Sequence, residues 1–337
     1  MRRLALPLSF RVAVIGCKPD GASTDPNTAT AAGDDSVPAS TAASAGDAGA
    51  NTRGPSWEQV GDAKLLVLDV GAEPRRLLRL QPAPGSTEVV ELRMEMAMRQ
   101  GIMGNESPLV RIPVTTMEVG LRVESVQDGK ITCETISRGY VVADDGSFPP
   151  EALARMRKEL AGIEGMRGHY VMTDRGVLEG VELDVPSTAS PSMQRTMKNM
   201  ADAIRQLSFP LPAEAVGPGA RWAVTDELDS AGIHLEQTAT YLLHGCDADK
   251  CTIDVELSQR IMDRDFSPPG MPSNVTAKVS EFNSSGDGHY EHDFRHVSPL
   301  ASSVGVSLRS VFDLQADDVK VQMVMDMDMQ TDFTLQR

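Results

Sequence analysis

The sequence predicts a mainly β (α+β) protein, built as a curved antiparallel sheet or half-barrel with two helices packed on it. Apolar and polar residues alternate over long stretches, and this period of two is typical of half-buried strands. Turn sequences such as Gln127-Asp128-Gly129 separate many of the stretches, which favours antiparallel meanders over βαβ units. The clearest predicted strands are 88–98, 110–126, 131–142, 234–243, 252–261 and 320–329.

Two stretches have helical spacing instead. Pro150 precedes residues 151–163, and proline is favoured in the first turn of a helix. Ser190 and Pro191 open the second stretch, which Pro210 ends. An apolar stripe on one side of this second helix must lie on apolar surface, so we expect both helices on the concave face of the sheet. The stripe consists of Met193, Met197, Met200, Ile204 and Leu207.

Length and charge limit the classes of function. A chain of 337 residues allows two ordinary domains or one large all-β domain. The formal net charge of -16 disfavours nucleic acids and anionic lipid headgroups as partners, because both are polyanions. Aromatic residues make up only 4% of the chain, which disfavours a stacking surface for single strands. We therefore expect no nucleic-acid partner.

The N-terminus has the pattern of an export signal. Arg2 and Arg3 precede the apolar run Leu4 to Gly16, which Arg11 interrupts and which is too short to span a bilayer as a helix. The run ends in Val14-Ile15-Gly16-Cys17, which resembles the lipobox of bacterial lipoproteins. That resemblance implies a signal peptide over residues 1–16, cleavage before Cys17 and attachment of diacylglycerol to its sulfur.

Residues 18–55 have the composition of a flexible tether. All but Lys18, Val37 and Arg53 are Ala, Gly, Ser, Thr, Asp, Asn or Pro, so the segment cannot bury enough apolar surface to offset its ordering entropy. A coil of this length spans roughly 34 Å. With the lipidated cysteine at residue 17, the segment 17–55 would hold a β-rich body, 56–337, clear of a membrane. In the lipoprotein class, Lys18 implies sorting to the outer membrane of a bacterial envelope, with the body facing the periplasm.

The middle of the chain carries a second resemblance. Pro210-Leu211-Pro212, then Val216-Gly217-Pro218-Gly219 and Trp222, is similar to a segment in a family of uncharacterised bacterial envelope lipoproteins. The resemblance implies a secreted β-rich body of unknown activity. The residues themselves indicate a loop between two halves, 56–209 and 210–337, with Trp222 in the core.

An internal repeat would explain two such halves. The tripeptide Gly168-His169-Tyr170 recurs as Gly288-His289-Tyr290, and a predicted hairpin turn recurs at the same offset. So few identities leave duplication of one unit and coincidence both open.

Cysteine and histidine provide few candidate sites. Cys246 and Cys251 flank a four-residue loop between predicted strands, and an oxidising envelope would allow them to form a disulfide rather than two free thiols. His289, His292 and His296 lie close together, but strand alternation places His289 on the opposite face from the other two. We therefore predict no metal site there, and no cofactor.

Methionine is the unusual residue, with 18 in the chain gathered into stripes. One stripe lies on the second predicted helix and two on predicted strands. Methionine fills irregular cores, so plain core is one interpretation. An adaptable apolar cavity for an acyl chain is another, and a copper(I) thioether site is a third. The candidate cavity residues are Met94, Met96, Met98, Met193, Met197, Met200, Met323, Met325, Met327 and Met329.

Patterns of known catalytic sites are missing from the sequence, which contains no Gly-x-Ser-x-Gly, His-Glu-x-x-His, phosphate loop or dinucleotide fingerprint. We name no catalytic residue and leave enzyme activity open. The preferred hypothesis is a membrane-anchored envelope lipoprotein that binds or scaffolds, with an apolar ligand such as lipid. The cavity resembles in architecture those of periplasmic lipid-carrier lipoproteins. An envelope hydrolase and a copper-handling or other metal-handling lipoprotein are the alternatives.

The lipidation hypothesis makes the first testable prediction. Cells grown with a labelled lipid precursor should incorporate label into the wild-type chain and not into the Cys17→Ser variant, because only the thiol accepts the diacylglycerol. A wild-type chain that stays unlabelled would show that this is not a lipidation signal.

Overall fold

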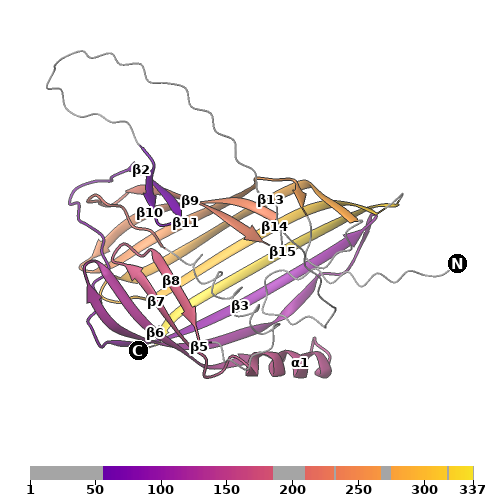
Figure 1. Ribbon diagram of the computed structural model, residues 1–337, viewed down its shortest axis with the longest axis horizontal. Coiled ribbons are helices and arrows are strands. Elements are labelled where there is room, and N and C mark those ends of the chain that lie inside the picture. Colours follow the sequence, from indigo (N-terminus) through magenta and orange to yellow (C-terminus); the bar gives the residue numbers. More distant parts are fainter. Residues whose placement is uncertain (1–55, 185–208, 231–232, 267–274, 317–318, 337) are drawn as a thin grey trace, which may run out of the picture.

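The computed structural model describes residues 56–184, 209–230, 233–266, 275–316 and 319–336 (Figure 1). The described residues form one antiparallel sheet of fifteen strands and a single helix. The main path of the sheet runs β1-β2-β9-β10-β11-β13-β14-β15-β3-β5-β6-β7-β8, with β4 beside β3 and β12 beside β13. The edge strands β1 and β8 do not pair with each other, so the sheet is open.

The bounds of the elements follow the predicted alternation closely. Each of the six clearest predicted strands lies within, or extends into, one long strand of the structure. The elements are β1 (Glu58–Val60), β2 (Ala63–Asp69), β3 (Thr87–Ile102), β4 (Asn105–Glu106), β5 (Val110–Gln127), β6 (Lys130–Val142), α1 (Pro150–Ala161), β7 (Arg167–Thr173), β8 (Leu178–Leu183), β9 (Arg221–Ser230), β10 (Ile233–Asp247), β11 (Lys250–Ile261), β12 (Asp265–Phe266), β13 (Val275–Asp293), β14 (Ala301–Ala316) and β15 (Val319–Gln336).

The two faces of the central strands differ in chemistry. On the convex face Asp326 of β15 lies opposite Arg99 of β3 and Arg309 of β14. Its carboxylate accepts hydrogen bonds from both guanidinium groups, at 2.7 and 2.8 Å. The odd-numbered residues of β15 form the other face, and they include Val321, the four methionines and Thr331. A one-residue slip in register would exchange these faces, so burial of the apolar one fixes the pairing.

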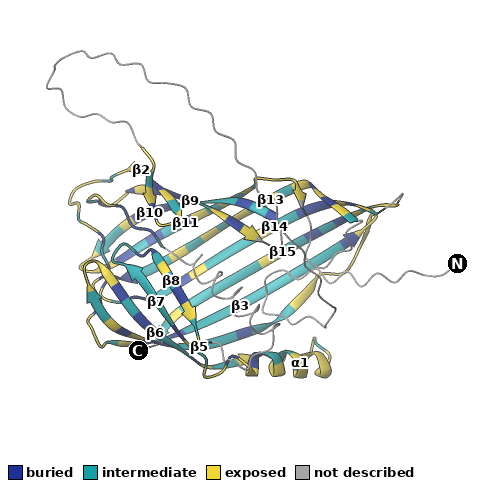
Figure 2. Cartoon of the chain, in the orientation of Figure 1, coloured by how far each residue is buried: buried dark blue, intermediate teal, exposed yellow. Residues whose placement is uncertain are grey.

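The main core lies where the two ends of the sheet curl toward each other (Figure 1). Leu121 of β5 and Ile131 of β6 belong to the same buried cluster as Trp222 of β9 and Tyr241 of β10. Figure 2 shows the buried residues in dark blue in these strands and in the adjoining loops. The loops include the predicted segment before β9, whose Pro210 carbonyl accepts a hydrogen bond from Trp222 Nε1 at 3.0 Å. Trp222 is fully buried, which confirms its predicted place in the core.

One of the two predicted helices is present in the described residues. Helix α1 has Pro150 in its first turn and buries Leu153 and Leu160 in a small cluster with Val142 and Tyr140 of β6. These two β6 residues lie on the concave face, as expected for the helix position. The second predicted helix, with Met193, Met197 and Met200, falls outside the described residues.

The two halves of the sheet share part of their pairing scheme. The hairpins β5–β6 and β10–β11 have equivalent partners at an offset of 120 residues, and a β-bulge interrupts each hairpin at the same place. The pairs of β6 with β7 and of β11 with β13 keep that offset. The matching pairs include Val126–Ile131 with Cys246–Cys251 and Cys133–Tyr170 with Ile253–Tyr290.

The two tryptophans of the chain give a matched test of the core. Trp222→Ala should lower the free energy of unfolding by about 3–5 kcal/mol, because it empties a fully buried site and leaves the Pro210 carbonyl unpaired. Trp57→Ala is the control, since this side chain is 49% exposed and its removal should cost less than about 1 kcal/mol. Urea titrations of both variants measure the difference, and equal losses would contradict the core placement.

Candidate functional site

Seven of the ten candidate methionines lie together on the concave face. They come from β3 and β15, which are hydrogen-bonded neighbours at the centre of the sheet. Met98 lies directly opposite Met327, and Met96 lies opposite Met329. Opposed side chains in an antiparallel pair have Cβ atoms about 4.5–5.5 Å apart, so the two stripes form one surface. The remaining three candidates, Met193, Met197 and Met200, fall outside the described residues.

Burial along this methionine face is graded. Met323 and Met325 are almost fully buried in a second core cluster with Phe312 of β14. Met327 and Met329 are half-buried, as are the three methionines of β3. On β14, Val306 lies opposite Met329 and Leu308 lies opposite Met327, and both are also half-buried. One end of the stripe is therefore core, and the other is apolar surface that water still reaches.

A polar row continues the methionine face across the neighbouring strands. Asp226 of β9 lies opposite Gln237 of β10, and Gln237 lies opposite Gln259 of β11. Gln259 Nε2 donates to Gln237 Oε1 at 2.8 Å, and Ser284 Oγ of β13 donates to Gln259 Oε1 at 2.8 Å. We call these four residues the polar row. Sequence reasoning missed them, although Asp226 stands at an inward position of β9 between Val224 and Leu228.

Asp226 is the one carboxylate of the polar row. Among the described residues no other side chain makes a hydrogen bond or ion pair with it. Partial burial without an opposite charge raises its pKa from 3.8 to about 6, because desolvation disfavours the charged form. A carboxylate held in this way gains from any ligand that brings a hydrogen-bond donor or a positive charge.

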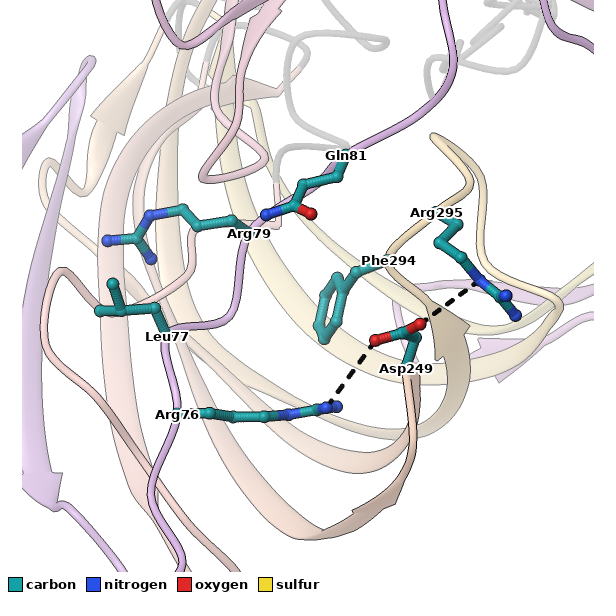
Figure 3. Close-up of a pocket in the computed structure, with 7 residues that line it drawn as sticks. All are labelled: Arg76, Leu77, Arg79, Gln81, Asp249, Phe294 and Arg295. Atoms are coloured by element: carbon teal, nitrogen blue, oxygen red, sulfur yellow. Dashed lines mark ion pairs between the residues drawn. The ribbon is translucent and has the colours of Figure 1, made fainter.

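The pocket of Figure 3 lies at the end of the sheet, between the loop after β2, the β10–β11 turn and the turn after β13. Its volume is about 200 Å³. Asp249 stands between Arg76 and Arg295, with N···O distances of 4.0 and 3.6 Å. The full lining is Arg76, Leu77, Arg79, Gln81, Asp249, Phe294 and Arg295.

The arginines of this pocket already have partners within the chain. Arg295 donates to the Asp293 carboxylate at 2.6 Å, and this lowers the pKa of Asp293 to about 2. Arg79 donates to the carbonyls of Pro212 and Ala213 and lies 3.8 Å from Asp174. Each guanidinium is balanced by a nearby carboxylate, so the arrangement fastens loops to the sheet and has no surplus charge for an anion.

Cys246 and Cys251 are joined by a disulfide across the β10–β11 hairpin, where they form a directly opposed pair. Arg76 Nη2 donates to the Cys251 sulfur at 3.0 Å, and its Nη1 donates to the Ala248 carbonyl. Cys133 is a buried free thiol in β6, and burial raises its pKa to about 11. A thiol with so high a pKa is a poor nucleophile.

The three candidate histidines do not converge. His289 lies on the convex face, where its Nδ1 is 2.6 Å from Asp254. His292 is buried on the concave face between aromatic rings, and desolvation lowers its pKa to about 4. The predicted common face of His292 and His296 is wrong, because β13 ends at Asp293 and His296 lies in the following turn, 3.3 Å from Glu88. Within the described ranges, no three His, Cys, Asp or Glu side chains are grouped to hold a metal ion.

Comparisons with known proteins add little. No protein-family profile matches the chain, and no curated protein is similar to it. A structure described as "Asymmetric conductivity of engineered proteins" is 10% identical over 73% of this chain and 100% of that one, with a TM-score of 0.18. A mutant of the Rh. blastica porin is 8% identical over 72% and 99%, with a TM-score of 0.18. The translocator domain of the autotransporter NalP from Neisseria meningitidis is 8% identical over 74% and 88%, with a TM-score of 0.14.

Likenesses at these scores carry no argument about fold or function. Within the part of the chain that the structure describes, no helix has the length and apolar character needed to cross a membrane.

The raised pKa of Asp226 predicts a pH-dependent stability difference. The folded chain holds this proton up to about pH 6 and the unfolded chain only to about 4, so the wild type loses stability as pH rises through that window. Asp226→Asn removes the loss and should be more stable by about 1 kcal/mol above the window, after allowance for solvent screening. Below about pH 4 the two chains should be equal.

Urea unfolding of both chains across this pH range measures the effect. Asp287→Asn, at an exposed position on the convex face of β13, serves as the control. A constant difference between wild type and Asp226→Asn at every pH would show that Asp226 does not titrate in this window.

Proposed function

We propose that the chain is a lipid-anchored envelope protein that binds an acyl chain or a similarly apolar ligand on its concave methionine face. The observation that carries this proposal is the half-buried part of that face. Met96, Met98, Met327 and Met329 form an adjoining set on two paired strands, and Val306 and Leu308 extend it. Such a contiguous apolar surface on a soluble body marks a binding site more often than an accident of packing.

Methionine suits this role better than leucine or valine would. Its unbranched side chain and polarisable sulfur adapt to ligands of irregular shape. The gradient of burial supports the same conclusion, because Met323 and Met325 anchor the stripe in the core while Met327 and Met329 stay accessible.

The N-terminal residues support the proposed lipid anchor and location. The lipobox-like Val14-Ile15-Gly16-Cys17 and the tether over 18–55 support attachment to a bacterial membrane, with sorting to the outer membrane and the body in the periplasm. The disulfide of Cys246 and Cys251 is compatible with that oxidising compartment. A tethered body with an apolar face could bind lipid or the lipid part of a partner close to the membrane surface.

A copper(I) site is the second candidate, on the same methionines. Thioether sulfur is a soft ligand that selects copper(I). The opposed pairs Met98–Met327 and Met96–Met329 bring four sulfurs from two adjacent strands into one neighbourhood. No observation on the described residues favours the hydrolase alternative.

Native mass spectrometry of the protein purified from an envelope extract without detergent distinguishes the two candidates. The Cys17→Ser chain is used, since it carries no lipid of its own. A bound mass that organic solvent releases supports the acyl ligand, and a mass of one copper ion supports the metal. A bare chain that also fails to take up 1-decanol would contradict the apolar-binding proposal.

A substitution on the methionine face tests the proposal further. Met327→Gln places an amide on the accessible part of the stripe and should weaken 1-decanol binding about tenfold, because burying the amide opposes the apolar contact. Met103→Gln is the control, since Met103 lies outside the stripe and is 66% exposed. Isothermal titration calorimetry measures both affinities. Equal affinities for the two variants would place the binding surface elsewhere.

A further inference from the structure

The polar row lies in line with the accessible methionines. Ser284 of β13 lies opposite Leu308 of β14, Leu308 opposite Met327 of β15, and Met327 opposite Met98 of β3. One transverse line across the concave face is therefore polar from β9 to β13 and apolar from β14 to β3. A ligand lying along this line meets hydrogen-bonding groups at one end and thioethers at the other.

The hydrogen bonds within the polar row run in one direction. Ser284 donates to Gln259, and Gln259 donates to Gln237. Gln237 lies opposite Asp226 in the register, and the amino group of its side-chain amide is the next donor in the row. The row thus ends in a side-chain donor beside a carboxylate, and among the described residues neither has a side-chain partner.

The fold itself does not require polar residues at these positions. The first half of the sheet carries apolar residues at comparable inward positions, with Met117 of β5 between Leu92 of β3 and Tyr140 of β6, although β5–β6 has a second bulge at Glu118–Val119 that β10–β11 lacks. In the second half the matching strands carry Asp226, Gln237 and Gln259. A carboxylate and two amides stand at half-buried inward positions, and burying such groups costs stability unless a partner compensates.

We propose that the polar row binds an extended polar head that ends in an ammonium group at Asp226, while the apolar tail of the same amphiphile lies on Met327 and Met98. Five inter-strand spacings of about 4.8 Å, roughly 24 Å in all, separate Asp226 from Met327, so the head covers the row from β9 to β13. This inference rests on the proposed function and names its ligand class. Charge complementarity selects the head: the ammonium donates to the Asp226 carboxylate, and the same carboxylate repels a phosphate or a fatty-acid head. Gln259 donates a hydrogen bond to Gln237, and this bond orients the two amides beside Asp226.

Three probes test this proposal. Each joins a decyl tail to a tetra(ethylene glycol) spacer that is long enough to cover the polar row, and the three end in an amine, a hydroxyl or a carboxylate. Isothermal titration calorimetry uses the Cys17→Ser chain, with each probe below its micelle-forming concentration, at a pH near 7.5 where the amine is protonated and the carboxylate is ionised. The wild-type face should bind the amine probe at least about tenfold more tightly than the carboxylate probe, with the hydroxyl probe between them. Asp226→Asn should bind the three probes within about twofold of one another.

The controls separate a local contact from the general negative charge of the chain. Asp287→Asn changes the net charge by the same amount on the convex face and should keep the tenfold preference. Asp226→Leu removes both the charge and the hydrogen-bonding atoms from this inward position, and should bind like Asp226→Asn. A preference that survives in both Asp226 variants would overturn the headgroup assignment.

The outcomes also distinguish this inference from the proposed function. Binding of all three probes with equal affinity to the wild type would reject the ammonium head and leave the apolar face intact. Failure of 1-decanol and of the amine probe alike to bind would reject both.

Discussion

The packing of the two ends of the sheet around Trp222 is the contact on which the rest of the structure depends. An open antiparallel sheet of this length would otherwise expose its apolar face to water. Leu121 and Ile131 from one end and Tyr241 from the other share the buried cluster of Trp222, so the sheet must stay curved. Loop residues contribute to the same cluster, and Arg79 fastens them by donating to the carbonyls of Pro212 and Ala213. Curvature then makes the methionine face concave.

Curvature also sets requirements on the strands between the two ends. Gly286 and Gly288 stand at inward positions in the middle of β13. A Cβ atom at Gly286 would lie 2.5 Å from the Gly305 carbonyl oxygen, and one at Gly288 would lie 2.8 Å from Val304 Cγ2. Atoms of the neighbouring strand therefore lie too close to both positions for a Cβ atom to fit, and glycine allows this close approach within a strand. On the convex side, the ion pairs of Asp326 with Arg99 and Arg309 hold β3, β15 and β14 in register.

The sequence predicted the parts of the fold that depend on local alternation. The period of two located the six long strands and the inward side of the methionines, because burial of one face leaves no freedom in register. It did not predict the order of the strands, since β15 joins β3 across most of the chain and such long-range pairing leaves no mark in either strand alone. The polar row escaped notice for the same reason. Asp226, Gln237 and Gln259 come from three strands, and each is an ordinary polar residue until the register aligns them.

The two halves of the sheet share part of their pairing scheme, and the polar row lies in only one of them. The turn residues Asp128 and Ala248 both have a φ of 51°, and the same bulge follows in each hairpin, so the two hairpins share their local backbone geometry next to the turn. This agreement supports duplication better than a shared Gly-His-Tyr does, because register and bulge are properties of many residues at once. The halves differ farther from the turn, where β5–β6 has a second bulge at Glu118–Val119. The half with Leu92 and Met117 carries apolar residues at these inward positions, whereas the half with Asp226 and Gln237 carries polar ones at a cost in stability, and such local conflicts with the core pattern are where functional sites are expected.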